Sequence, residues 1–414
     1  MCYGASSSSP GSNRVGGGLH DLLADATTDS NVVRLPIDSR QIIDNLRYER
    51  YARNGLGTRT QLTERHHAFH QIYYRLRGFL PVAIRKHLQR LALRNWRNIP
   101  FPGWPVDGTV ERILERLLVL SMKAQGLHRI PFIWFWPDGA AGCAIMTHDV
   151  ETRPGRDFCS HLMDLDNSAG IRSSFQIVPE ERYTVSDSFL AEIRSRGFEI
   201  NIHDLNHDGR LFASYDEFLR RARRINDHGK RYGAVGFRSG GLYRNPAWFS
   251  ALEFSYDMSI PSTAHLDPQR GGCCSLMPFF IDDVLELPLT TMQDYSLFNV
   301  LNDYSIDIWT EQLSAITARN GLATFLVHPD YIRTQRAQKT YRALLEHLAR
   351  MRDEAKLWLP LPGEVDQWWR QRRHLTIVGE DGAYSIQGQG KERARLAFAT
   401  LAGDTLTFDI AEQN

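Results

Sequence analysis

The stretch Ala144-Ile145-Met146-Thr147-His148-Asp149-Val150-Glu151 decides the fold. Its apolar start is typical of a buried strand, and it ends in two carboxylates separated by one residue. Side chains alternate along a strand, so Asp149 and Glu151 are expected on the same side. One carboxylate of such a pair can hold a metal ion while the other moves a proton. Taken alone, the stretch indicates a strand that ends in a solvated acidic turn more often than it indicates such a site.

Similar apolar runs alternate with helical stretches from about residue 131 onward. The predicted strands are 131–136, 143–147, 173–177, 199–202, 235–238 and 324–328, and the predicted helices include 186–195, 215–231, 307–320 and 335–353. Repeated alternation predicts an α/β domain with parallel strands, either open or barrel-like. Catalytic side chains in such folds gather at the carboxyl ends of the strands.

Several strand ends carry polar side chains. His203 and His207 follow the strand 199–202, and histidines four apart in a helical turn face the same way and can share a metal ion. The chain has 15 histidines, so this spacing is weak evidence by itself. It gains weight because Arg238 and His328 end two further strands.

The order of these residues resembles the motifs of the polysaccharide deacetylases, the family 4 carbohydrate esterases with the NodB homology domain. The resemblance covers about residues 136–372, and its motifs correspond to 147–151, 203–207, 238–241, the stretch around Asp257, and 326–328. It implies a distorted (β/α) barrel with fewer than eight strands and a catalytic divalent metal, usually zinc. Two positions depart from the family pattern: Val150 replaces the second of two adjacent aspartates, and Gly240 replaces a proline.

The resemblance implies a role for each site residue. His203, His207 and Glu151 are the expected metal ligands, and Zn²⁺ is the metal expected first. We expect four catalytic residues: Asp149 takes a proton from the attacking water, His328 protonates the leaving amine, Arg238 orients Asp149, and Asp257 holds His328 or Arg238 in place. His148 points away from Asp149 on an ideal strand and is predicted to be a packed histidine.

The chain divides into four predicted regions. Residues 1–31 are rich in Ser, Gly, Asn and Asp and predict a disordered leader. Residues 32–135 form a helical region, 136–372 the deacetylase-like domain, and 373–414 a small β appendage. The segment 75–97 has seven basic and no acidic residues. It is either a helix on an anionic membrane or partner, or an amphipathic helix packed on the catalytic domain.

The composition limits the partners. A formal net charge of +1 gives no overall reason to expect a nucleic-acid partner. Five cysteines without regular spacing, and no visible secretory signal or long apolar run, predict a cytoplasmic protein. Such an enzyme reaches a lipid-linked or nucleotide-linked precursor more easily than finished cell-wall polymer.

The predicted reaction is removal of acetyl from an N-acetylated sugar. Aromatic residues near the motifs favour stacking against a sugar face: Tyr243, Trp248, Tyr295 and Tyr331. Two alternatives stay open. One is a catalytically degenerate sugar-binding or scaffold module of the same fold, and the other is a hydrolase of a small non-sugar amide. The oligomeric state is not predicted.

Overall fold

A computed structural model describes residues 24–29, 31–53, 93, 96–379 and 384–411. Its centre is a nine-stranded sheet in which the seven strands from β11 to β10 all run parallel. In spatial order these strands are β11 (Leu322–Leu326), β4 (Gly142–Val150), β5 (Ser173–Ile177), β6 (Glu199–His203), β7 (Gly236–Arg238), β8 (Tyr256–Asp257) and β10 (Val284–Glu286), followed by antiparallel β9 (Phe279–Ile281), with β12 (Leu357–Trp358) beside the start of β4. The predicted α/β class is confirmed.

The two ends of the parallel run meet through side chains. After β10 the chain continues to Thr290, whose hydroxyl donates to the carbonyl of Leu322 and accepts from the backbone N–H of Thr324. The hydroxyl of Thr291 donates to the carbonyl of Thr324. Threonine hydroxyls therefore join the segment after β10 to β11, the first strand of the sheet, and this gives the barrel-like closure.

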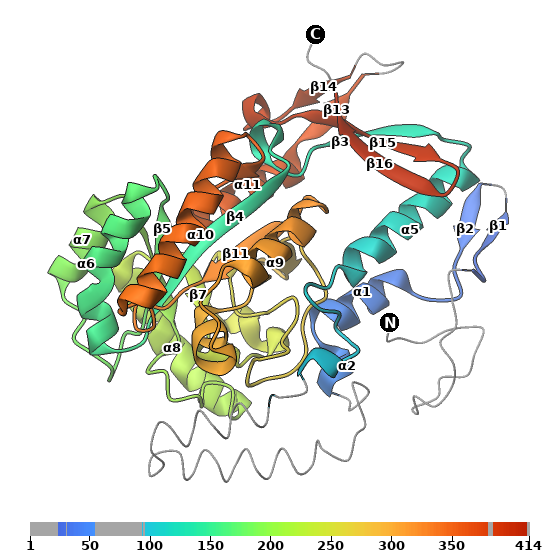
Figure 1. The fold of residues 1–414 in the computed structure, drawn as a ribbon. Helices are drawn as coiled ribbons and strands as arrows, with labels where there is room; N and C mark the ends of the chain where they lie inside the picture. Colours follow the sequence, from blue (N-terminus) through green and yellow to red (C-terminus); the bar gives the residue numbers. More distant parts are fainter. Residues whose placement is uncertain (1–23, 30, 54–92, 94–95, 380–383, 412–414) are drawn as a thin grey trace.

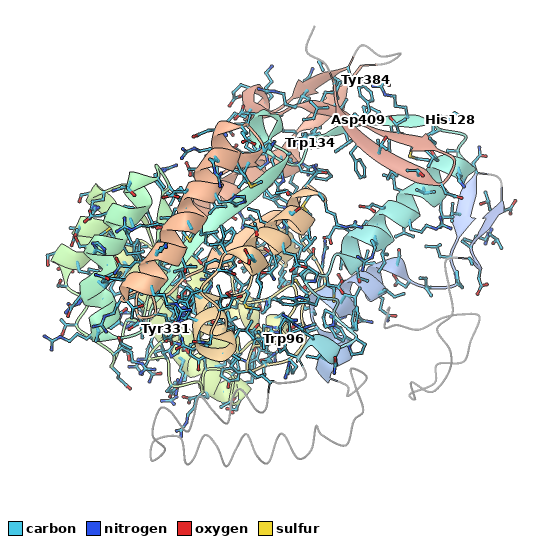
Figure 2. The ribbon with its side chains drawn as sticks, in the orientation of Figure 1. Trp96, His128, Trp134, Tyr331, Tyr384 and Asp409 are labelled. Carbon is cyan, nitrogen blue, oxygen red and sulfur yellow. The ribbon has the colours of Figure 1, made fainter. Side chains whose placement is uncertain are left out.

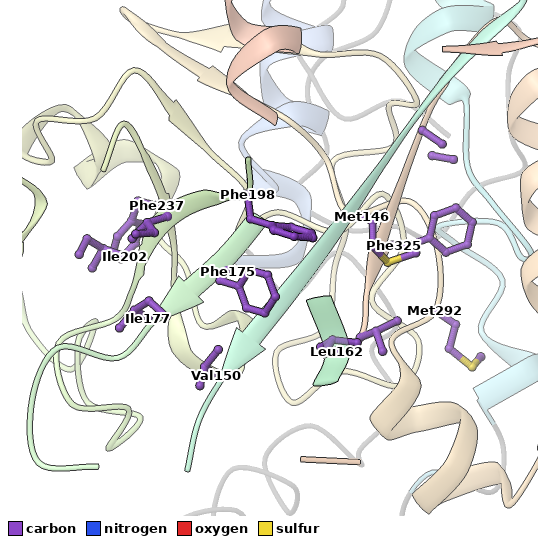
Figure 3. Close-up of a cluster of buried hydrophobic side chains, with 14 of the residues drawn as sticks. Met146, Val150, Leu162, Phe175, Ile177, Phe198, Ile202, Phe237, Met292 and Phe325 are labelled. Atoms are coloured by element: carbon purple, nitrogen blue, oxygen red, sulfur yellow. The ribbon is translucent and has the colours of Figure 1, made fainter. Parts of the chain in front are cut away.

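The sheet buries a different core on each side. Inside the barrel, Ile145, Met258 and Leu285 belong to one buried cluster with Trp136 and Trp368. The larger core lies between the sheet and its helices, and Figure 3 shows part of it: Met146, Val150, Leu162, Phe175, Ile177, Phe198, Ile202, Phe237, Met292 and Phe325. This double burial explains why the strands are apolar runs rather than alternating patterns.

Helices lie around the sheet (Figure 1). They are α6 (Arg153–Ser168), α7 (Asp187–Ser195), α8 (Tyr215–Tyr232), α9 (Asp307–Thr317), α10 (Gln335–Asp353) and α11 (Pro362–His374). The hydroxyls of Thr152, Ser186, Ser214 and Thr334 accept backbone N–H groups of the first turns and so fix where four of them begin. Short turns of helix are η1 (Trp96–Asn98), η2 (Pro137–Gly139), η3 (Gly240–Leu242), η4 (Pro246–Ala251), the π-helix η5 (Tyr295–Leu301) and η6 (Lys391–Arg393).

The N-terminal region contributes α1 (Ser39–Arg47), α2 (Arg50–Arg53) and α5 (Thr109–Ala124), with a hairpin of β1 (Thr27–Asp29) and β2 (Val32–Arg34). Most of the basic segment 75–97 falls outside the described residues. No helix in the described part of the chain is long and apolar enough to cross a membrane.

The C-terminal region, predicted as a small β appendage, contains β13 (Thr376–Val378), β14 (Ser385–Gln387), β15 (Leu396–Ala402) and β16 (Thr405–Ile410). One prediction was wrong. The strand expected at 131–136 is β3 (Arg129–Ile133), and it pairs with β15 instead of joining the large sheet. Figure 2 shows Trp134, Tyr384 and Asp409 near this small sheet, at the opposite end of the view from Tyr331.

Candidate active site

Three potential metal ligands converge at the carboxyl ends of β4 and β6. One ligand atom from each of Glu151, His203 and His207 lies within 4.8 Å of the others. Glu151 Oε1 is 3.0 Å from Nε2 of His207 and 3.9 Å from Nε2 of His203. The structure thus brings together all three residues that the sequence predicted as ligands.

Backbone geometry at the end of β6 places the two histidines. His203 is the last residue of the strand, whereas His207 lies in the following loop. The predicted reason for their convergence was wrong, because the segment 203–207 is not a helical turn. Asp204 and His207 instead adopt left-handed φ angles of 57° and 54°, which fold the loop back towards the strand end. Such backbone strain is often found at functional sites.

The donor set suits a divalent cation such as Zn²⁺. The Nε2 atoms of His203 and His207 are buried and form no hydrogen bond with good angles, although Oε1 of Glu151 approaches that of His207 to 3.0 Å. Nδ1 of His203 donates to the carbonyl of Arg238 at 3.1 Å, so its Nε2 lone pair is free to bind a metal. The guanidinium of Arg182 lies 3.1 Å from Nδ1 of His207. When a neutral imidazole binds a metal through Nε2, its Nδ1 carries the proton and cannot accept a hydrogen bond from a guanidinium. Metal binding by His207 through Nε2 therefore requires Arg182 to turn away. Two imidazoles and one carboxylate fit a zinc site with an open position.

Asp149 lies beside this cluster and is held by a buried arginine. Its Oδ2 is 3.5 Å from Nε2 of His203, and its Oδ1 accepts from Arg238 at 2.8 Å. Arg238 also donates to Thr147 and to the carbonyl of Met258. Burial alone would raise the pKa of Asp149, but Arg238 and two imidazoles lower it below its usual value. Asp149 is therefore a fixed, ionised carboxylate.

His328 lies beside Glu151 of the cluster. Its Nε2 is 3.5 Å from Oε1 of Glu151, and its Nδ1 donates to Asp294 over 2.6 Å. Asp294 also accepts the backbone N–H of His328 at 2.8 Å. Burial would lower the pKa of His328, but Asp294 and Glu151 raise it well above its usual value. The imidazole is thereby oriented with Nε2 towards the cluster.

Asp257 was predicted to hold His328 or Arg238, but His328 bonds to Asp294, and the guanidinium of Arg238 bonds to Thr147, Asp149 and Met258. Asp257 accepts hydrogen bonds from the backbone and the hydroxyl of Ser259, and it forms a buried acidic pair with Glu286. Burial raises the pKa of Asp257 to about 6. Its register partner is Phe237, whose side faces the helices, whereas Arg238 faces the barrel interior. Asp257 is therefore removed from the site.

Asp294 was missed because no local signal marks it. It follows no strand and directly precedes the π-helix η5. Helices of this type occur often at functional sites, but they have no sequence signature that would have revealed this one. Asp294 lies in the segment between β10 and α9, away from the strand ends on which the prediction rested.

His148 is a packed histidine, as predicted. Its Nδ1 bonds to the carbonyl of Val327, and its Nε2 lies 3.0 Å from the buried carboxylate of Asp166. It thereby ties the end of β4 to the residue before His328 from the helix-facing side of the sheet.

Aromatic rings border the cluster on the His328 side. The ring of Tyr331 is centred 5.0 Å from that of His328 and 5.2 Å from that of Tyr295. Trp248, by contrast, packs against Phe212 and Phe218.

Comparisons with known proteins complete the description. No family model matches the chain, and no curated protein does. Similar solved structures include a Mycobacterium smegmatis protein assigned as a polysaccharide deacetylase, with 18% identity, a TM-score of 0.48, and 60% of this chain and 98% of that chain covered. An allantoinase has 11% identity and a TM-score of 0.44, with 57% and 92% covered. A family 4 acetyl xylan esterase from Clostridium thermocellum, in complex with a cobalt ion, has 14% identity and a TM-score of 0.35, with 55% and 91% covered.

Proposed function

We propose that this protein is a metal-dependent hydrolase that removes acetyl groups from an N-acetylated sugar. The observation that carries the proposal is the convergence of Glu151, His203 and His207 next to two further groups. Asp149 approaches His203 of this cluster, and His328 approaches Glu151, each over 3.5 Å. Hydrolysis of an acetamide needs a site for an activated water, a group to take its proton, and a group to protonate the departing amine.

Glu151, His203 and His207 would hold the divalent metal. When bound, such an ion lowers the pKa of water and polarises a carbonyl oxygen. Because no other protein ligand atom belongs to the cluster in the described part of the chain, coordination positions are left for water and substrate. These are the requirements of a catalytic rather than a structural zinc site.

The flanking residues would move the protons. Asp149 is ionised and held at 2.8 Å by Arg238, so it would accept the proton of the attacking water. His328 would donate a proton to the leaving nitrogen from Nε2, since Asp294 holds its Nδ1–H. The roles of base and acid are thus divided between two residues that approach different members of the cluster.

Metal analysis and acetate release on purified variants test this division. Asp149→Asn should retain the metal and lose turnover, while His203→Ala should lose both. The wild type should release acetate from at least one member of a panel of N-acetylated sugars and sugar lipids. Loss of metal in Asp149→Asn would make Asp149 a ligand, and full activity of His203→Ala would overturn the site. A metal-loaded protein that releases acetate from no substrate would favour a sugar-binding module instead.

A further inference from the structure

A buried ion pair joins the N-terminal region to the loop that follows β7. Glu49 lies between α1 and α2, and Arg244 lies just after η3. Both side chains are at most 2% exposed. The Nε and Nη2 atoms of Arg244 donate to the two carboxylate oxygens of Glu49 at 2.7 and 2.5 Å. Such a two-pronged bond fixes the orientation of the guanidinium as well as its position.

Close backbone contacts surround this ion pair. Glu49 has a left-handed φ of 53°, and a Cβ on Gly271 would lie 2.6 Å from its Oε1. The side chain of Gln269 accepts the backbone N–H of Arg244 at 3.0 Å and donates to its carbonyl at 3.2 Å. The arginine is therefore fixed at its backbone and at its guanidinium by different segments of the chain.

The fixed guanidinium holds a strained stretch of backbone. Its Nη1 atom donates to the carbonyl of Leu242 at 2.7 Å. Leu242 has a left-handed φ of 55°, and the preceding Gly241 has one of 60°. This conformation is unfavourable for leucine and persists only where the surroundings hold it. Because the remaining donor of Arg244 ends on this residue, the ion pair stabilises η3 in its observed shape.

The turn η3 packs against the loop that carries His207. A Cβ on Gly240 would lie 2.9 Å from Cδ2 of His207 and 2.5 Å from Oδ2 of Asp204. Asp204 and His207 both have left-handed φ angles, so their loop also depends on its surroundings to keep its shape. The backbone of Gly240 is thus the wall against which the imidazole of His207 rests.

We propose that Glu49 is a positioning residue for His207 and acts through Arg244 and the backbone of residues 240–242. This inference rests on the proposed function in one respect, the assignment of His207 as a metal ligand. Without Glu49, the buried guanidinium loses its counter-charge and turns away from the carbonyl of Leu242. The wall beside the imidazole then relaxes, and metal affinity falls. The N-terminal region is in this way part of the metal site.

Replacing both partners separates positioning from stability. Removing one member of a buried ion pair leaves the other charge unpaired, whereas replacing both by apolar side chains is often neutral. Glu49→Met should therefore lose stability to urea, and the double variant Glu49→Met/Arg244→Met should recover most of it. The double variant still lacks the bond to the carbonyl of Leu242.

Glu111→Met is the matched control. Glu111 is another buried carboxylate of the N-terminal region, but it accepts hydrogen bonds from the hydroxyl of Ser275 and the backbone N–H of Leu276 instead of the loop after β7. Its replacement should destabilise the full-length protein without changing the surroundings of His207.

Zinc affinity is measured on each full-length variant by competition with a chelator. We expect it to fall about tenfold in Glu49→Met and in the double variant, the lower end of the range for residues that support metal ligands. Glu111→Met should bind zinc as the wild type does. In the metal-free protein, nitrogen NMR of labelled histidines should show a shifted His207 signal in the first two variants alone. The signal is identified by its absence from His207→Gln.

Wild-type zinc affinity in the double variant, or an equal loss in Glu111→Met, would overturn the proposal, because the ion pair would then contribute stability alone. If the wild type binds no zinc, the proposed metal site fails. The NMR comparison still decides the inference in that case, since an unshifted His207 signal in Glu49→Met means that Glu49 does not position this imidazole.

Discussion

Replacing Arg238 by methionine tests how the site keeps Asp149 ionised. Arg238 is fully buried and Asp149 nearly so, and their side chains meet at 2.8 Å. Methionine preserves much of the aliphatic stem but removes the charge and every donor. The variant therefore leaves a carboxylate in the barrel interior without its cation.

The expected cost follows from this burial. Removing one partner of a buried pair destabilises a protein by about 3–5 kcal/mol, because the remaining charge stays unpaired. The pKa of Asp149 is lower in the folded wild type than in the unfolded chain, where it is about 3.9. The ion pair therefore stabilises the folded state fully at pH values above about 3.9, and this stabilisation is lost as the pH falls through the folded pKa. In Arg238→Met burial is opposed only by the imidazoles, and the pKa rises. Protonation then relieves the penalty, so the cost should shrink with falling pH.

Urea unfolding of the metal-free protein at pH 7.5 and pH 5, followed by tryptophan fluorescence, measures this cost. We expect Arg238→Met to lose about 3–5 kcal/mol of unfolding free energy at pH 7.5 and clearly less at pH 5. The loss should also be smaller in an Asp149→Asn background, where no carboxylate is left unpaired. A loss below about 1 kcal/mol at pH 7.5, or an equal loss at both values, would refute the argument that burial and pairing set the ionisation of Asp149.

Two further substitutions test the groups that position the site. Asp294→Asn keeps a hydrogen-bond acceptor but removes the negative charge that holds His328. We expect acetate release to fall at least about 100-fold, while metal analysis shows an unchanged metal content. Asp330 accepts hydrogen bonds from the hydroxyl of Thr152 and the backbone of Glu151. Asp330→Ala should weaken metal binding by about 10–100-fold, as measured in competition with a chelator, whereas Asp330→Asn should keep most of the wild-type affinity. Equal metal affinity of the wild type and both variants would contradict a positioning role for Asp330.

Strand ends could be predicted from the sequence because their signals are local. The run 144–151 shows its apolar length and its terminal carboxylates without any knowledge of the rest of the chain. The same holds for His203 and His328, each of which follows a short apolar run. Parallel strands bring such ends to one edge of the sheet, so an ordered series of strand ends predicts a site.

Asp294 could not be predicted because its position depends on contacts far apart in the chain. The hydroxyls of Thr290 and Thr291 join the segment that carries Asp294 to β11. Each of these threonines precedes its partner in β11 by more than 30 residues. Only after this closure does Asp294 meet His328, which lies 34 residues away. A motif search has no access to this loop geometry.

Asp257 shows a second limit, the register between strands. Asp257 aligns with Phe237, which in turn aligns with Ile202, and both partners lie in the core under the helices (Figure 3). His203 aligns with Arg238, one residue further along, and that row faces the barrel interior. A shift of one residue moves a side chain to the other face of a sheet. The sequence shows where β8 lies but not this offset, so it does not show which face of the sheet Asp257 occupies. The shared side of Asp149 and Glu151 needs no such register, because it follows from alternation along one chain segment.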